Sequence, residues 1–83
     1  MSNAPADPQT VEIDALGLLC PLPVLRTRRR MQTLAEGTVV RVRADDPAAR
    51  VDLPHFCAEQ GHALLDEAEE PGGVLVFTLR KGG

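Results

Sequence analysis

The stretch LLCPLP, residues 18–23, decides how this chain folds, because it lies where a strand-like segment gives way to an amphipathic helix. Pro21 fits the first position of a helix, which has no N–H to lose. Cys20 is therefore expected at a helix N-terminus, where backbone N–H groups lack partners and the macrodipole is positive. Both features favour the thiolate over the thiol, so Cys20 is a candidate reactive cysteine.

The residues alone leave the role of Cys20 open. A free cysteine has a pKa of about 8.5, and a helix terminus contributes only about 0.3 to 1 kcal/mol, so most of the thiol stays protonated at neutral pH. Any further lowering of the pKa of Cys20 would have to come from nearby cations, and the candidates are Arg26, Arg28, Arg29 and Arg30. The alternative is a small hydrophobic side chain that closes the strand-to-helix junction.

Length and composition limit the chain to one small core. It has 83 residues, of which 43% are hydrophobic. Phe56 and Phe77 are the only aromatic residues, which argues against a stacking platform for single-stranded nucleic acid. The net charge of −3 argues against general polyanion binding. We expect residues 1–10 to be a disordered tail and residues 11–83 to form a single domain.

The two cysteines, Cys20 and Cys57, form no C-x-x-C pair and are expected to be free thiols. Cys57 is expected in the core, with an auxiliary thiol as the alternative. A metal site of Cys57, His55 and His62 has no zinc spacing, so neither a metal nor a cofactor is expected. The sequence shows no signal peptide or membrane span, which indicates a cytoplasmic protein.

Apolar periodicity predicts six elements. Alternation of period two indicates strands at residues 11–16, 38–43, 62–69 and 74–80. Helices are expected from residue 21 to about 35 and from residue 52 or 53 to 60, ended by Gly37 and Gly61.

The side chains expected to form the buried face of the first helix are Val24, Leu25, Met31 and Leu34. In the second helix they are Leu53, Phe56 and Cys57. Asp52 is expected to cap that helix and Pro54 to fall in its first turn.

The order β-α-β-α-β-β predicts an α+β two-layer sandwich. Strands joined through a helix are expected to pair in parallel with a right-handed crossover, whereas the last two strands flank a Pro-Gly-Gly turn, residues 71–73, and pair antiparallel. The result is a mixed four-stranded sheet with both helices on one face.

Four stretches resemble the TusA (SirA-like) family of small sulfur-carrier proteins. They are DALGLLCPLP at residues 14–23, ADDPA at 44–48, DLPHFC at 52–57 and LRKGG at 79–83. The first contains the C-P-x-P motif that opens the first helix in that family. The resemblance covers residues 11–83 and implies the same β-α-β-α-β-β fold.

The resemblance also implies the chemistry. In this family the motif cysteine carries sulfane sulfur as a persulfide, which makes Cys20 the catalytic residue of a sulfurtransferase and Pro21 and Pro23 its supports. Partners would be a sulfur donor, such as a cysteine desulfurase or a rhodanese-like protein, and an acceptor protein serving tRNA 2-thiolation, sulfur oxidation or cofactor supply. Leu22 departs from the acidic residue frequent at that position in tRNA-thiolation carriers, which leaves the acceptor open.

Two other interpretations remain. The arginines form either a solvated helix face or a docking surface. The docking partner would be an acidic protein or, with less support from the sequence, tRNA. A non-catalytic binding or regulatory module would use that basic helix alone. Gly82-Gly83 invites comparison with carriers that form a C-terminal thiocarboxylate, although the β-hairpin start of a β-grasp fold is missing. We expect the remaining acidic residues to serve turns, caps and an exposed hairpin face: Asp45, Asp46, Asp52, Asp66, Glu67, Glu69 and Glu70.

Overall fold

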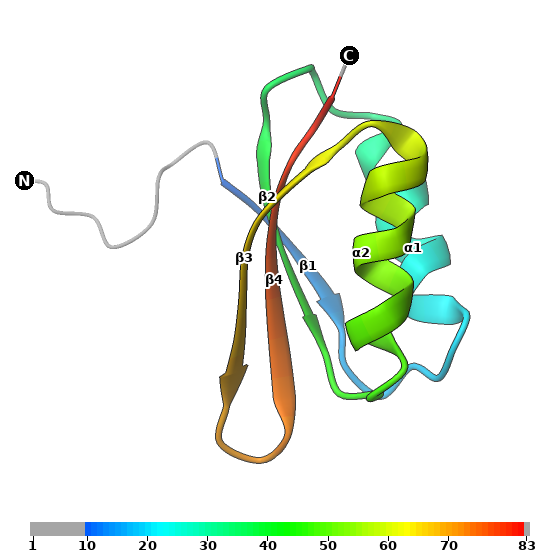
Figure 1. The fold of residues 1–83 in the computed structure, drawn as a ribbon, viewed down its shortest axis with the longest axis vertical. Helices are drawn as coiled ribbons and strands as arrows, with labels where there is room; N and C mark the ends of the chain where they lie inside the picture. Colours follow the sequence, from blue (N-terminus) through cyan, green and yellow to red (C-terminus); the bar gives the residue numbers. More distant parts are fainter. Residues whose placement is uncertain (1–9, 83) are drawn as a thin grey trace, which may run out of the picture.

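Two helices cover one face of a four-stranded sheet in a computed structural model that describes residues 10–82 (Figure 1). The elements are β1 Val11–Ala15, α1 Leu22–Met31, β2 Val39–Ala44, α2 Ala49–Gln60, β3 Ala63–Glu70 and β4 Val74–Arg80. This confirms the predicted β-α-β-α-β-β order and two-layer architecture. The tail expected over residues 1–10 lies outside the described residues except for Thr10, and so does Gly83.

The sheet has the strand order β1-β2-β4-β3. β1 pairs in parallel with β2, from Val11 opposite Val40 to Ala15 opposite Ala44, and β4 pairs antiparallel with both β2 and β3. The β3–β4 hairpin turns at two consecutive glycines with φ of 86° and 79°, a conformation that glycine adopts without strain. The parallel pair matters for function, because it places the C-terminal ends of β1 and β2 at the same edge of the sheet.

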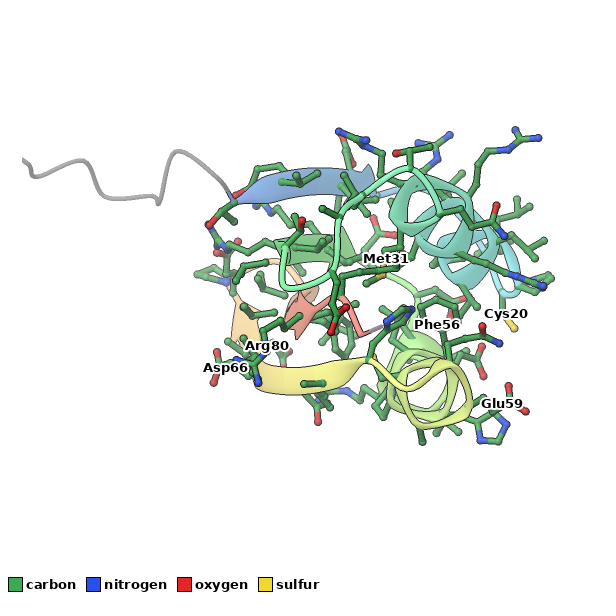
Figure 2. The ribbon with its side chains drawn as sticks, turned by 90° about the horizontal axis from the view of Figure 1, so that it is seen from above. Cys20, Met31, Phe56, Glu59, Asp66 and Arg80 are labelled. Atoms are coloured by element: carbon green, nitrogen blue, oxygen red, sulfur yellow. The ribbon has the colours of Figure 1, made fainter. Side chains whose placement is uncertain are left out.

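The core lies between the sheet and the helices. Alternate residues of β2 and β4 face the helices, and the register sets Val42 opposite Phe77 and Val40 opposite Leu79, all at most 1% exposed. Met31 of α1 belongs to the same core and is 1% exposed, and Figure 2 shows its side chain between the sheet and the helices. Each such side chain contributes about 1.5 to 3 kcal/mol by leaving water.

The first helix is shorter than predicted, and its buried face is different. It begins at Leu22, with Pro21 as N-cap, and ends at Met31, where the backbone tightens into a turn through a hydrogen bond from the Leu34 N–H to the Met31 carbonyl. Pro23, Thr27 and Met31 form the buried face, at a spacing of four residues, whereas Leu25 is 48% exposed.

Thr27 was not expected in the core. Its hydroxyl donates a hydrogen bond of 2.8 Å to the Pro23 carbonyl, which lets a polar side chain be buried without an unpaired donor. Val24 and Leu34, which were expected on the buried face, are partly buried and pack against the core from its edge.

The second helix begins at Ala49, three or four residues earlier than the predicted start at residue 52 or 53. The carboxylate that accepts a backbone N–H at the start of this helix belongs to Asp46 and not to Asp52. The Asp46 Oδ1 atom accepts the Ala48 N–H at 3.0 Å. Pro54 consequently lies inside the helix instead of in its first turn. Gly61 ends the helix in the left-handed conformation with φ of 76°, as predicted. Within residues 10–82, no helix is long and apolar enough to cross a membrane.

The contribution of α2 to stability is testable by truncating its central core residue. Leu53 is fully buried, so Leu53→Ala should lower the free energy of unfolding by about 2 to 5 kcal/mol through lost burial and a residual cavity. The matched change Val51→Ala on the same helix, at a side chain 72% exposed, should stay within about 0.5 kcal/mol. Urea titration followed by circular dichroism measures both, and equal effects would contradict the packing of α2 described here.

Candidate functional site

Cys20 lies in the loop between β1 and α1, one residue before the N-cap of α1. Its side chain is exposed and points away from the sheet, as Figure 2 shows. Leu19, its neighbour, is 71% exposed. The thiol is therefore open to contact by another macromolecule.

Two aspartates after β2 hold this loop in place. Asp46 Oδ2 accepts the Cys20 backbone N–H at 2.6 Å, while both carboxylate oxygens of Asp45 accept the Gly17 N–H, at 3.0 and 3.2 Å. Gly17 has φ of 77°, which suits glycine and turns the chain toward Asp45. Hydrogen bonds from the backbones of Ala48 and Cys20 lower the pKa of Asp46, so its carboxylate stays ionised at neutral pH.

Asp52 contacts the sulfur itself. The Cys20 thiol donates a hydrogen bond of 2.9 Å to Oδ2 of Asp52, which lies in the first turn of α2. The pKa of Cys20 lies above its ordinary value, chiefly because of this hydrogen bond, then because of desolvation and the negative charges of Asp52 and Asp46. The expected preference for thiolate at a helix terminus is therefore outweighed, because the sulfur bonds to a carboxylate of α2 rather than to the free N–H groups of α1.

A hollow of about 240 Å³ adjoins Cys20, between α1 and α2. Leu25 and Arg28 of α1 line one side, and Asp52, Phe56 and Glu59 are among the lining residues from α2. The surface next to the thiol thus combines apolar side chains with charges of both signs.

A second and larger hollow, of about 490 Å³, is lined by Leu18, Leu22, Leu25, Arg26 and Arg29. Leu22 and Leu25 are each 48% exposed. The position between the two motif prolines is therefore part of an exposed apolar patch with a cationic border.

The four arginines of α1 do not form one surface around the sulfur. Arg28 lines the hollow beside Cys20, whereas Arg26 and Arg29 line the second one. Arg26 donates to the Asp14 carbonyl at 2.9 Å, and Arg30 donates to the Thr33 hydroxyl at 2.8 Å. None of the four is among the groups that shift the pKa of Cys20.

Cys57 is 2% exposed on the inner face of α2, where it was expected in the core. Burial and the charge of Glu67 raise its pKa to about 11, so its thiol is inert at neutral pH. His55 pairs with Glu59 on the exposed face of the helix. In the part of the chain that the structure describes, no three potential ligand side chains gather as a metal site would require.

The penultimate glycine has a packing role. The Gly82 N–H donates to His62 Nδ1 at 2.9 Å, and a Cβ atom on Gly82 would overlap the Gly61 carbonyl oxygen. A glycine is therefore required at position 82 whether or not the terminus carries any chemistry. Gly83, the residue on which a thiocarboxylate would form, lies outside the described residues.

Asp46 and Asp52 are the site residues that sequence reasoning assigned only to turns and caps. A signal for Asp46 was present: parallel β1 and β2 end at one edge of the sheet, so the loops after them, one with Cys20 and the other with Asp45 and Asp46, must meet there. Asp52 had no comparable signal, because its position depends on where α2 begins.

Comparison with known proteins agrees with this fold. Residues 11–81 match the family described as Sulfurtransferase TusA. Sulfur carrier protein TusA of Pseudomonas entomophila is 44% identical over 69 residues, which cover 83% of this chain and 86% of the relative. YrkI of Bacillus subtilis is 40% identical over 70 residues, covering 84% of this chain and 92% of YrkI.

A solved structure gives the same result in three dimensions. The crystal structure of a SirA-like protein from Desulfitobacterium hafniense superposes with a TM-score of 0.78 at 34% identity, over 88% of this chain and 99% of that protein. The sequence match extends from the first strand to the end of the last one, and the two-layer fold is shared. This chain therefore belongs to the TusA family.

Proposed function

We propose that this protein is a sulfur carrier that holds sulfane sulfur as a persulfide on Cys20 and passes it to the thiol of an acceptor protein. The observation that carries the proposal is the exposed Cys20 thiol, hydrogen-bonded at 2.9 Å to Asp52. The curated relative from Pseudomonas entomophila is named a sulfur carrier protein. Cys20 also occupies the C-P-x-P segment, with Pro21 as N-cap and Pro23 in the first turn of α1.

Loading exchanges one persulfide for another. The Cys20 sulfur attacks the outer sulfur of a donor cysteine persulfide while Asp52 is placed to accept the thiol proton. A new S–S bond forms to Cys20, the donor S–S bond breaks, and the donor cysteine leaves as a thiolate that takes up a proton. No external oxidant or reductant is needed, because the sulfane sulfur changes only its carrier.

Unloading follows the same pattern. An acceptor thiolate attacks the outer sulfur of the Cys20 persulfide, and Cys20 leaves as a thiolate that regains a proton from Asp52 or water. The raised pKa of Cys20 keeps the unloaded carrier mainly in the thiol form at neutral pH, which slows its reaction with oxidants. Asp52 thus positions the sulfur for transfer and protects it between transfers.

The surface beside Cys20 suits a protein partner. Leu22 and Leu25 form an exposed apolar centre, and Arg26 and Arg29 form a cationic border, the arrangement found where proteins associate. A donor such as a cysteine desulfurase or a rhodanese-like protein, and the acceptor after it, would present an apolar patch with acidic residues around it. The cytoplasm would keep Cys20 reduced and ready for loading.

The first test is direct detection of the carried sulfur. Incubation with a cysteine desulfurase and cysteine should add the mass of one sulfur atom to the intact protein, and a reductant should remove it. Cys20→Ser should abolish the gain, whereas Cys57→Ala, which removes the buried thiol, should retain it. A gain that survives Cys20→Ser, or never occurs in the wild-type protein, would refute the carrier assignment.

The hydrogen bond from Cys20 to Asp52 predicts a pKa change of known sign. Asp52→Asn removes the negative charge that favours the protonated thiol, so the pKa of Cys20 should fall. Iodoacetamide alkylation measured as a function of pH reports this pKa. Glu59→Gln, a neutralisation in the same hollow without a bond to the sulfur, should leave it nearly unchanged. An unchanged or higher pKa in Asp52→Asn would contradict the role given to Asp52.

The docking surface predicts a salt-dependent loading rate. Arg29→Glu reverses a charge in the second hollow and should slow loading by a desulfurase severalfold at low salt, with a smaller difference when salt screens the charges. Arg50→Glu, at an exposed arginine paired with Glu69 in this structure, serves as the matched reversal and should have little effect. Equal rates for Arg29→Glu and wild type at low salt would contradict the proposal that α1 forms part of the docking surface.

A further inference from the structure

A third hollow, of about 280 Å³, lies toward the C-terminal ends of the two helices and shares Arg28, Phe56 and Gln60 with the hollow beside Cys20. Its polar lining comes from three regions: Arg28 and Gln32 at the end of α1, Gln60 and His62 at the end of α2, and Lys81 after β4. Met31 and Phe56 provide apolar surface. All five polar side chains are able to donate hydrogen bonds, and no carboxylate is among the lining residues.

The two cations of this hollow have no carboxylate beside them among the residues that the structure describes. Within residues 10–82, neither Arg28 nor Lys81 has a carboxylate within 4.0 Å. The arginines of β2 and α2 behave differently, because Arg41, Arg43 and Arg50 each pair with a glutamate. Two uncompensated cations in one concave surface attract an anion from solution.

The donors are also held in position. Lys81 is fixed by backbone hydrogen bonds to Gly37 and Thr38, and its Nζ atom donates to the Leu34 carbonyl at 3.1 Å. Two of its three N–H groups remain available. His62 Nδ1 accepts the Gly82 N–H at 2.9 Å, so the neutral ring carries its proton on Nε2.

Apart from the Lys81 bond to Leu34, no side-chain hydrogen bond within residues 10–82 uses these donors. Arg28 makes no side-chain hydrogen bond to residues 10–82, and the Nε2–H group of His62 has no partner there. Burial and the charge of Lys81 lower the pKa of His62, which keeps the ring neutral while the hollow holds no anion.

We propose that this hollow binds the oxyanion group of a phosphate-type ligand through Arg28, Lys81 and the amide and imidazole N–H groups beside them. The guanidinium offers the paired N–H groups that fit two oxygens of an oxyanion, and the ammonium adds a point charge. A water molecule takes about 30 Å³ in the liquid, so the hollow has room for more than one oxyanion. The apolar surface of Met31 and Phe56 would then contact the remainder of an organic phosphate.

Nuclear magnetic resonance of the full ¹⁵N-labelled chain tests this site with inorganic phosphate and with AMP, at constant ionic strength. We expect saturable shifts of the Gly82 amide, the His62 ring and the side-chain amides of Gln32 and Gln60. Lys81→Gln and Arg28→Gln should each weaken binding about tenfold or more, since each removes a charge-assisted hydrogen bond. Arg29→Gln, the neighbouring arginine outside this hollow, should bind as wild type does.

The two ligands distinguish a free anion from an organic phosphate. Equal affinities indicate that the oxyanion alone is recognised, and tighter AMP binding indicates contact with Met31 and Phe56. Shifts that do not saturate, or that persist unchanged in both Lys81→Gln and Arg28→Gln, would overturn the proposal. Cys20→Ser should bind phosphate normally, so this result is independent of whether Cys20 carries sulfur.

Discussion

The carboxylate of Asp46 ties two loops together, and the geometry of the Cys20 corner depends on it. One oxygen accepts the N–H of Cys20 and the other accepts the N–H of Ala48 at the start of α2. The same residue therefore sets where the cysteine lies and where the second helix begins. Because α2 begins there, Asp52 falls within hydrogen-bonding distance of the sulfur. This chain of contacts is possible because parallel β1 and β2 end at one edge of the sheet.

The electrostatics of the corner favour a protected thiol over a permanently activated one. A carrier must survive between two protein encounters, and a thiolate open to solvent would meet oxidants in that interval. The Asp52 carboxylate favours the protonated form of Cys20 while remaining placed to accept its proton during an attack. In the proposed mechanism, activation is coupled to the arrival of a donor persulfide. None of the arginines of α1 shifts the pKa of the cysteine.

Local patterns predicted most of the fold, because its strands are short, regular and half-buried. Period-two alternation identified β4 to the residue and the other strands to within one residue at each end. The helices were less predictable, since their limits depend on contacts made elsewhere in the chain. Leu25 looked like a core residue, yet α1 turns Thr27 inward instead, and the Thr27 hydroxyl is satisfied only by the backbone of its own helix.

By itself the sequence determined the order of the elements, the glycine turn of the hairpin and the identity of Cys20 as the candidate thiol. These depend on residues close together in the chain, or on a motif within one loop. Tertiary structure alone decided the direction in which the pKa of Cys20 shifts, because the carboxylate that raises it lies 32 positions away in α2. It also decided which arginine lines the hollow next to Cys20 and which ones line the neighbouring hollow. A pKa responds to charges within a few ångströms in space, whatever their separation along the chain.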